Sequence, residues 1–139
     1  MSIFINMKLL DLILEDVNTP FKEKTKITIV NSDGKNIAVD CEVPTTPEEK
    51  MTGLMYRENL CDNCGMFFEP IEGGFWMKNV KIPLEMIFIS GDRIVDIKKA
   101  KPNDETIINS SVESDSNLEV NDGFCKSNNI TVGNQIYKS

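Results

Sequence analysis

The chain has 139 residues, of which 40% are hydrophobic and 27% are charged, as expected for one soluble globular domain. Its formal net charge of −7 disfavours binding to nucleic acids and to anionic membranes, because both bind clustered Lys and Arg. The chain contains no histidine, which excludes Ser-His and Cys-His triads and zinc sites that rely on imidazole.

An amphipathic helix is predicted near the N-terminus and ends before Pro20. Residues 1–24 are therefore interpreted as a helical extension that packs on its own domain or docks on a partner. The segment is too charged for a convincing signal peptide, and no apolar run reaches the roughly 18 residues of a membrane-spanning helix, so we expect a cytoplasmic protein. The apolar face of this helix comprises Leu9, Leu10, Leu12, Ile13 and Leu14, opposite Asp11, Glu15 and Asp16.

A β-hairpin and a helix are predicted at the start of the main domain, residues 25–139. Residues 25–30 and 37–43 have strand patterns on either side of the turn sequence 31–34. Thr46 is a typical N-cap, with Pro47 in the first turn and Glu49 three residues after the cap. We expect this helix to extend to about Arg57, with its apolar side facing inward at Met51, Leu54 and Met55.

The central stretch, residues 65–89, contains the only Trp and four of the seven Phe, and is the predicted core. Three strands are predicted in it: 66–68, 75–77 after a Gly73-Gly74 reversal, and 84–89 after Pro83. The remaining predicted elements are a strand at 94–97, a polar loop at 102–117, a strand at 118–120, a short helix capped by Asp122 and ending near Asn128, and a closing segment at 130–137.

Several segments resemble the ordered signature of the DUF192 family, over roughly residues 37–137. FWMKN followed by IPL is the most specific of them. The function of this family is unknown, so the resemblance implies a compact β-rich domain and no established reaction. The segments are GLMYR (53–57), GMFF (65–68), FWMKN (75–79), IPL (82–84), IFI (87–89), LEVN (118–121), GF (123–124) and I-x-VG (130–133).

Together these patterns predict an α+β fold: a single β-rich domain with a curved, mostly antiparallel sheet or partly closed barrel and short helices. The polar members of the family-like segments could converge on one pocket, where the cations would bind a carboxylate or phosphate. The same residues would equally serve as a structural network of ion pairs and turn contacts. These candidate ligand-binding residues are Arg57, Lys78, Asn79, Glu85, Glu119 and Asn121.

Cys61 and Cys64 form a C-x-x-C motif, which is typical of half a zinc site or of a redox pair. The other two cysteines, Cys41 and Cys125, are far apart in sequence, and Asp62 disfavours a thiolate. We therefore expect reduced, structural thiols and no cofactor, with zinc binding or thiol-redox chemistry as the alternatives.

The sequence favours a non-enzymatic binding or accessory domain with a polar pocket for a small anionic ligand or a peptide. One alternative is an interaction protein that uses the N-terminal helix, and another is a zinc or redox protein that uses Cys61 and Cys64. A small ligand or a protein is the expected partner, and nucleic acids and membranes are not expected.

Overall fold

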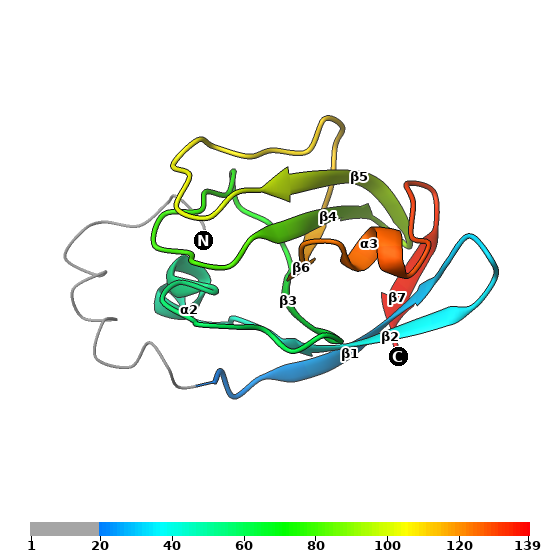
Figure 1. The fold of residues 1–139 in the computed structure, drawn as a ribbon, viewed down its shortest axis with the longest axis horizontal. Coiled ribbons are helices and arrows are strands. Elements are labelled where there is room, and N and C mark those ends of the chain that lie inside the picture. Colours follow the sequence, from blue (N-terminus) through cyan, green and yellow to red (C-terminus); the bar gives the residue numbers. More distant parts are fainter. Residues whose placement is uncertain (1–19) are drawn as a thin grey trace.

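The computed structural model describes residues 20–139, so the helix predicted within residues 1–24 lies almost wholly outside the described residues. One sheet closes into a barrel with the strand order β1-β2-β3-β6-β4-β5-β7, and α2 and α3 lie at opposite ends of it (Figure 1). The predicted β-rich domain with short helices is confirmed. The elements are β1 Lys24–Val30, β2 Asn36–Glu42, α2 Pro47–Thr52, β3 Cys64–Phe68, β4 Leu84–Ser90, β5 Arg93–Ala100, β6 Ser116–Asn121, α3 Phe124–Ser127 and β7 Gln135–Lys138.

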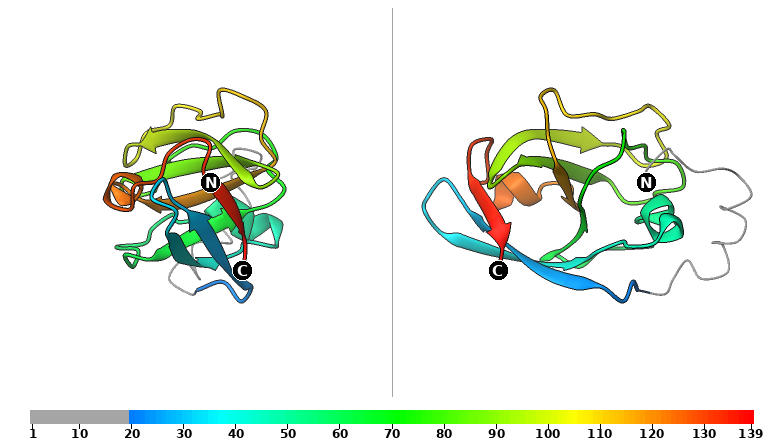
Figure 2. Two further views of the ribbon diagram at one scale, coloured as in Figure 1. Left: turned by 90° about the vertical axis from the view of Figure 1, so that its right-hand side faces the viewer. Right: turned by 180° about the vertical axis from the view of Figure 1, so that it is seen from behind.

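Neighbouring strands of the barrel are antiparallel, except for β2 and β3, which run parallel over a short stretch. The predicted hairpin of β1 and β2 is confirmed, as are β4 and the strand that follows it. The barrel closes between β5 and β7 through a single pair, Arg93 and Gln135. Figure 2 shows β7 completing the ring between β1 and β5.

Two apolar clusters lie on opposite faces of the sheet, because successive residues of a strand point to opposite sides. The inner cluster draws on all seven strands and fills the barrel, and it includes Ile87 and Leu118. The outer cluster packs α2 and the loops against the outside of β3, β4 and the end of β5. Buried members of the outer cluster include Met51, Leu54, Met55, Met66, Phe68, Phe75, Met86 and Phe88.

Helix α2 begins as predicted and ends earlier than predicted. Thr46 accepts the Glu49 N–H, and the Glu49 carboxylate accepts the Thr46 N–H, which completes a capping box. The helix ends at Thr52 instead of Arg57 because Gly53 adopts a positive φ of 47°. The expected inward residues after the helix, Leu54 and Met55, are nevertheless fully buried in the outer cluster.

The strand predicted at residues 75–77 is wrong. Only Phe75 makes a β-bridge, to Ile108, with backbone N–H···O distances of 2.9 and 2.6 Å. The position beside β3 that a hairpin would occupy is taken by β6. The chain after β3 therefore leaves the sheet and joins the outer layer, where Phe75 and Met77 are buried.

Helix α3 is present, but Asp122 does not cap it. Glu85 in β4 accepts the N–H groups of Gly123 at 3.0 Å and of Cys125 at 2.9 Å. The Asp122 carboxylate instead contacts Lys99 at the surface, at 3.2 Å. Glu85 is 3% exposed and lies on the barrel-facing side of β4. Its buried carboxylate therefore joins the sheet to α3, which packs on the inner cluster.

We predict that Glu85→Gln lowers the free energy of unfolding by about 1.5–3 kcal/mol, because an amide cannot accept from both N–H groups as the carboxylate does. Asp122→Asn removes only an exposed ion pair and should cost less than about 1 kcal/mol. Urea unfolding of both variants measures the difference. Equal losses would show that Glu85 is not the cap.

Candidate functional site

The outward face of β6 is polar and yet buried. Residues 117–121, N-L-E-V-N, alternate polar and apolar as in a strand with one face in water. Leu118 and Val120 do point into the barrel. On the other face, however, Asn117 and Glu119 are 0% exposed. Strand β6 lies between β3 and β4, beneath the outer layer, so neither of its faces reaches water at these positions.

Asn117 and Glu119 have apolar neighbours on both adjacent strands. Asn117 lies opposite Phe68 and Phe88, and Glu119 lies opposite Met66 and Met86. None of their four side-chain N and O atoms has a hydrogen-bond partner within residues 20–139. Burial of polar groups without hydrogen-bond partners costs several kcal/mol. Asn117 and Glu119 therefore destabilise the folded state, and stability does not explain why the strand carries them.

Burial has a direct electrostatic effect on Glu119. Loss of solvation raises the pKa of its carboxyl from 4.5 to about 7, and no lysine or arginine side chain offsets the effect. The acid is therefore close to half protonated at neutral pH. A buried acid whose pKa is shifted this far is a candidate for a functional site.

Other polar atoms without partners belong to the layer that covers this face. They are Oγ1 of Thr52, at the end of α2, Nε1 of Trp76 and Nε of Arg57. Trp76 packs against the outer cluster, and Thr52 adjoins its member Met51. Buried polar groups without partners thus lie both in the outer layer and on the strand beneath it.

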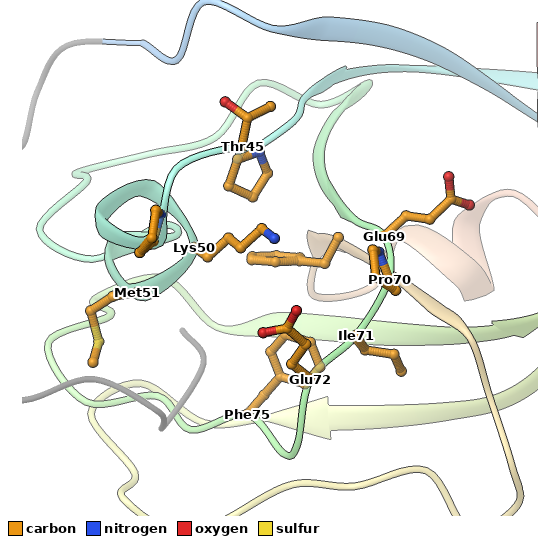
Figure 3. Close-up of a pocket in the computed structure, with 11 residues that line it drawn as sticks. Thr45, Lys50, Met51, Glu69, Pro70, Ile71, Glu72 and Phe75 are labelled. Atoms are coloured by element: carbon orange, nitrogen blue, oxygen red, sulfur yellow. The ribbon is translucent and has the colours of Figure 1, made fainter.

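A pocket of about 280 Å³ lies at the edge of the outer layer, beside α2. Lys50 extends from α2 toward the centre of the pocket, and the carboxylate of Glu72 points into it from the opposite wall (Figure 3). Apolar walls come from Phe68, Phe75, Ile71, Pro44, Pro47 and Pro70.

The aromatic wall of this pocket connects it to the buried polar strand. The Phe68 and Phe75 rings meet edge to face with centroids 5.2 Å apart, and the Phe75 and Phe88 centroids are 6.2 Å apart. Phe68 and Phe88 are the two residues that lie opposite Asn117. One residue of the pocket wall, Phe68, therefore also flanks Asn117 on β6.

Arg57, predicted to bind an anionic ligand, is engaged within the protein. Its guanidinium forms two hydrogen bonds with Glu42, at 2.6 and 2.8 Å, and lies 5.3 Å from the Phe21 ring centroid. Burial alone would raise the pKa of Glu42, but the hydrogen bonds from Arg57 and from the Phe21 N–H lower it below the usual value. This bidentate pair joins the residues after α2 to the end of β2.

Two further predicted residues, Asn79 and Lys78, lie in the outer layer with partners of their own. The Asn79 amide donates to the Tyr56 hydroxyl at 2.8 Å, and the Asn79 carbonyl accepts the Tyr56 N–H at 2.8 Å. Asn79 and Tyr56 both have positive φ, a conformation that asparagine tolerates better than most residues do. The Lys78 ammonium lies 5.3 Å from the Trp76 ring.

The last two predicted residues face other parts of the molecule. Glu85 holds α3, and Asn121 donates to the carbonyls of Leu60 and Cys61 at 2.8 and 3.2 Å. Five of the six predicted residues thus have separate partners, whereas Glu119 has none among residues 20–139. Asn117 and the pocket were not predicted. The only sequence signal for Asn117 is its place two residues before Glu119, on the same face of β6.

The cysteine motif differs from the expected free thiols, because Cys61 and Cys64 form a disulfide, with their Cα atoms 5.1 Å apart. Cys41 and Cys125 are free and buried. Burial raises the pKa of the Cys41 thiol to about 12, and it also raises that of Cys125. Within residues 20–139 no group of three or more His, Cys, Asp or Glu is arranged to hold a metal ion.

Fold and site together define a small β-barrel domain with a covered outer face and a pocket at the edge of the cover. The DUF192 family model (Uncharacterized ACR, COG1430) matches residues 28–137, and the chain belongs to this family. A search of curated proteins finds no match. Among the described residues, no helix has the length and hydrophobicity needed to span a membrane.

Two crystal structures share the fold. One, from Sinorhizobium meliloti 1021 and provisionally described as a transcription regulator, is 28% identical with a TM-score of 0.79, and the match covers 87% of this chain and 97% of that one. The other, a protein of unknown function from Novosphingobium aromaticivorans DSM 12444, is 32% identical with a TM-score of 0.75, covering 82% of this chain and 84% of that one.

The raised pKa of Glu119 predicts that stability falls as pH increases. In the unfolded chain the carboxyl titrates near 4.5, so the folded state binds more protons between pH 4.5 and about 7. The protein should lose up to about 3 kcal/mol across this window relative to Glu119→Gln, which cannot ionise. Urea unfolding at several pH values tests this. Parallel pH profiles for the protein and for Glu119→Gln would contradict this prediction. Glu113→Gln, at an exposed glutamate, is the matched control.

Proposed function

We propose that the protein is a non-enzymatic binding domain whose pocket beside α2 holds an apolar group of a small ligand. The observation that carries this proposal is the pocket itself, about 280 Å³ in volume, with aromatic, aliphatic and proline walls. Its size is near the lower end of the range for ligand pockets, which suits a compact group. The prolines restrict the backbone around the pocket, which reduces the entropy lost when a ligand binds.

The geometry supports an apolar group better than the anionic ligand expected from the sequence. The guanidinium of Arg57 is held by Glu42, away from this pocket. The charged residues that line the pocket are of both signs, with Lys50 accompanied by Glu69 and Glu72. The walls, in contrast, are mostly apolar, so burial of apolar surface would supply most of the binding free energy.

DNA binding is not part of this proposal, although one solved relative is described as a transcription regulator. The formal net charge of this chain is −7, and DNA binding depends on basic side chains that replace the counterions of phosphates. The proposed ligand is therefore a small molecule with an apolar group.

We predict that Ile71→Trp blocks the pocket, because Ile71 lines it and is only partly buried, so that a larger ring can fill the space. NMR spectra recorded during titration with small apolar fragments should show amide shifts around Lys50 and Phe75 in the unmodified protein. The same fragments should bind at least about tenfold more weakly to the variant, equivalent to about 1.4 kcal/mol.

Val112→Trp is the matched control, since Val112 is 54% exposed and does not line the pocket. It should leave fragment binding unchanged. Shifts that persist in Ile71→Trp, or a broad apolar library that produces no shift near the pocket, would refute the proposed function.

A further inference from the structure

We propose that Asn117 and Glu119 form an inner subsite, behind the aromatic wall of the pocket, for a primary ammonium group on an apolar ligand. This inference rests on the proposed function and specifies the class of ligand. The two residues are fully buried, and both face the layer to which the pocket wall belongs. In the part of the chain that the structure describes, none of their side-chain polar atoms has a partner.

The number and type of polar atoms fit an ammonium group. Residues two apart on one strand point to the same face, about 6.6 Å apart along the strand, and their side chains are long enough to approach one point. Glu119 contributes two carboxylate oxygens and Asn117 one amide oxygen. An ammonium has three N–H donors and no acceptor, so it can satisfy the three oxygens, whereas the fourth polar atom, Asn117 Nδ2, is itself a donor and does not bind it.

The charge at this position selects against the other simple head groups. A carboxylate or phosphate ligand would meet the buried carboxylate of Glu119, which has no lysine or arginine beside it. A hydroxyl has one donor and would leave two of the three oxygens unsatisfied. A guanidinium is planar and broad, whereas an ammonium is a compact charge that needs less displacement of the side chains of β3 and β4. Charge pairing is also stronger here than at the surface, because water is excluded.

Phe68 connects the pocket to the proposed subsite. Phe68 and Phe75 line the pocket, and Phe68 lies directly opposite Asn117. Glu119 is flanked by Met66 and Met86, whose unbranched side chains can change rotamer to admit a ligand. A linear molecule with its apolar body in the pocket would therefore direct its terminal ammonium toward the two polar residues.

Titration with n-hexylamine, 1-hexanol and hexanoate at about pH 7.5 tests this inference, since the three probes share an apolar chain and differ in head group. Calorimetry and NMR should show that the unmodified protein binds the amine about tenfold or more tightly than the alcohol, as expected for hydrogen bonds to a charged group. Hexanoate should bind most weakly. Glu119→Gln should abolish the preference for the amine and still bind the alcohol.

The variants separate the inference from the proposed function. Ile71→Trp should weaken binding of both the amine and the alcohol, whereas Glu119→Gln should affect only the amine. Equal binding of amine and alcohol to the unmodified protein, or an amine preference that survives in Glu119→Gln, overturns the inference and leaves the pocket in place. If neither probe binds, the inference and the proposed function both fail. Glu113→Gln, at an exposed glutamate, controls for the loss of one negative charge.

Discussion

The structure depends on one constraint: the sheet around β6 is covered on both faces. The inner cluster fills the barrel on one side, and α2 with the neighbouring loops covers the other. A strand in this position can place apolar residues on both faces at no cost. This strand instead carries Asn117 and Glu119 on its outward face, and no described residue pairs with their side chains. The outer layer must therefore be stable enough to keep a carboxyl and an amide out of water.

Ionic and polar pairs at the margin of the outer layer contribute to that stability. Arg57 and Glu42 connect the residues after α2 to β2, and their side chains are each 14% exposed. Tyr56 and Asn79 connect the same segment to the 75–82 region through two hydrogen bonds. Because these residues are engaged with one another, they are structural members of the cover. On the strand beneath the cover, in contrast, Asn117 and Glu119 have no hydrogen-bond partners among the described residues.

Local patterns in the sequence predicted the local structure well. The capping box of Thr46 and Glu49, the β1–β2 hairpin and the strand at β4 follow from spacing and turn residues alone. Long-range pairing could not be predicted in this way. The placement of β6 between β3 and β4 displaced the strand expected at residues 75–77, and Glu85 caps a helix about forty residues later in the chain. No local pattern specifies such contacts.

The site was predicted in part, for the same reason. The family-like segment 118–121 points to Glu119 as a candidate. The alternating pattern of its strand indicates a solvent-exposed face, whereas the side chain is fully buried. Its neighbours are Met66 and Met86 instead of the expected Arg57 and Lys78. The pairing of Arg57 with Glu42 joins residues in different segments, and nothing in the sequence around Glu42 distinguishes it from the other acids. Burial, which raises the pKa of Glu119, and the hydrogen bonds that lower the pKa of Glu42 both depend on the tertiary structure.

Direct titration of the Glu119 side-chain carboxyl carbon by NMR tests the account most directly. A buried carboxyl without a partner should titrate with a pKa near 7, well above its ordinary value of 4.5, and an added primary amine should lower that pKa. A Glu119 carboxyl that titrates near 4.5 in the protein alone would show that the group is solvated or already paired, and would contradict the account.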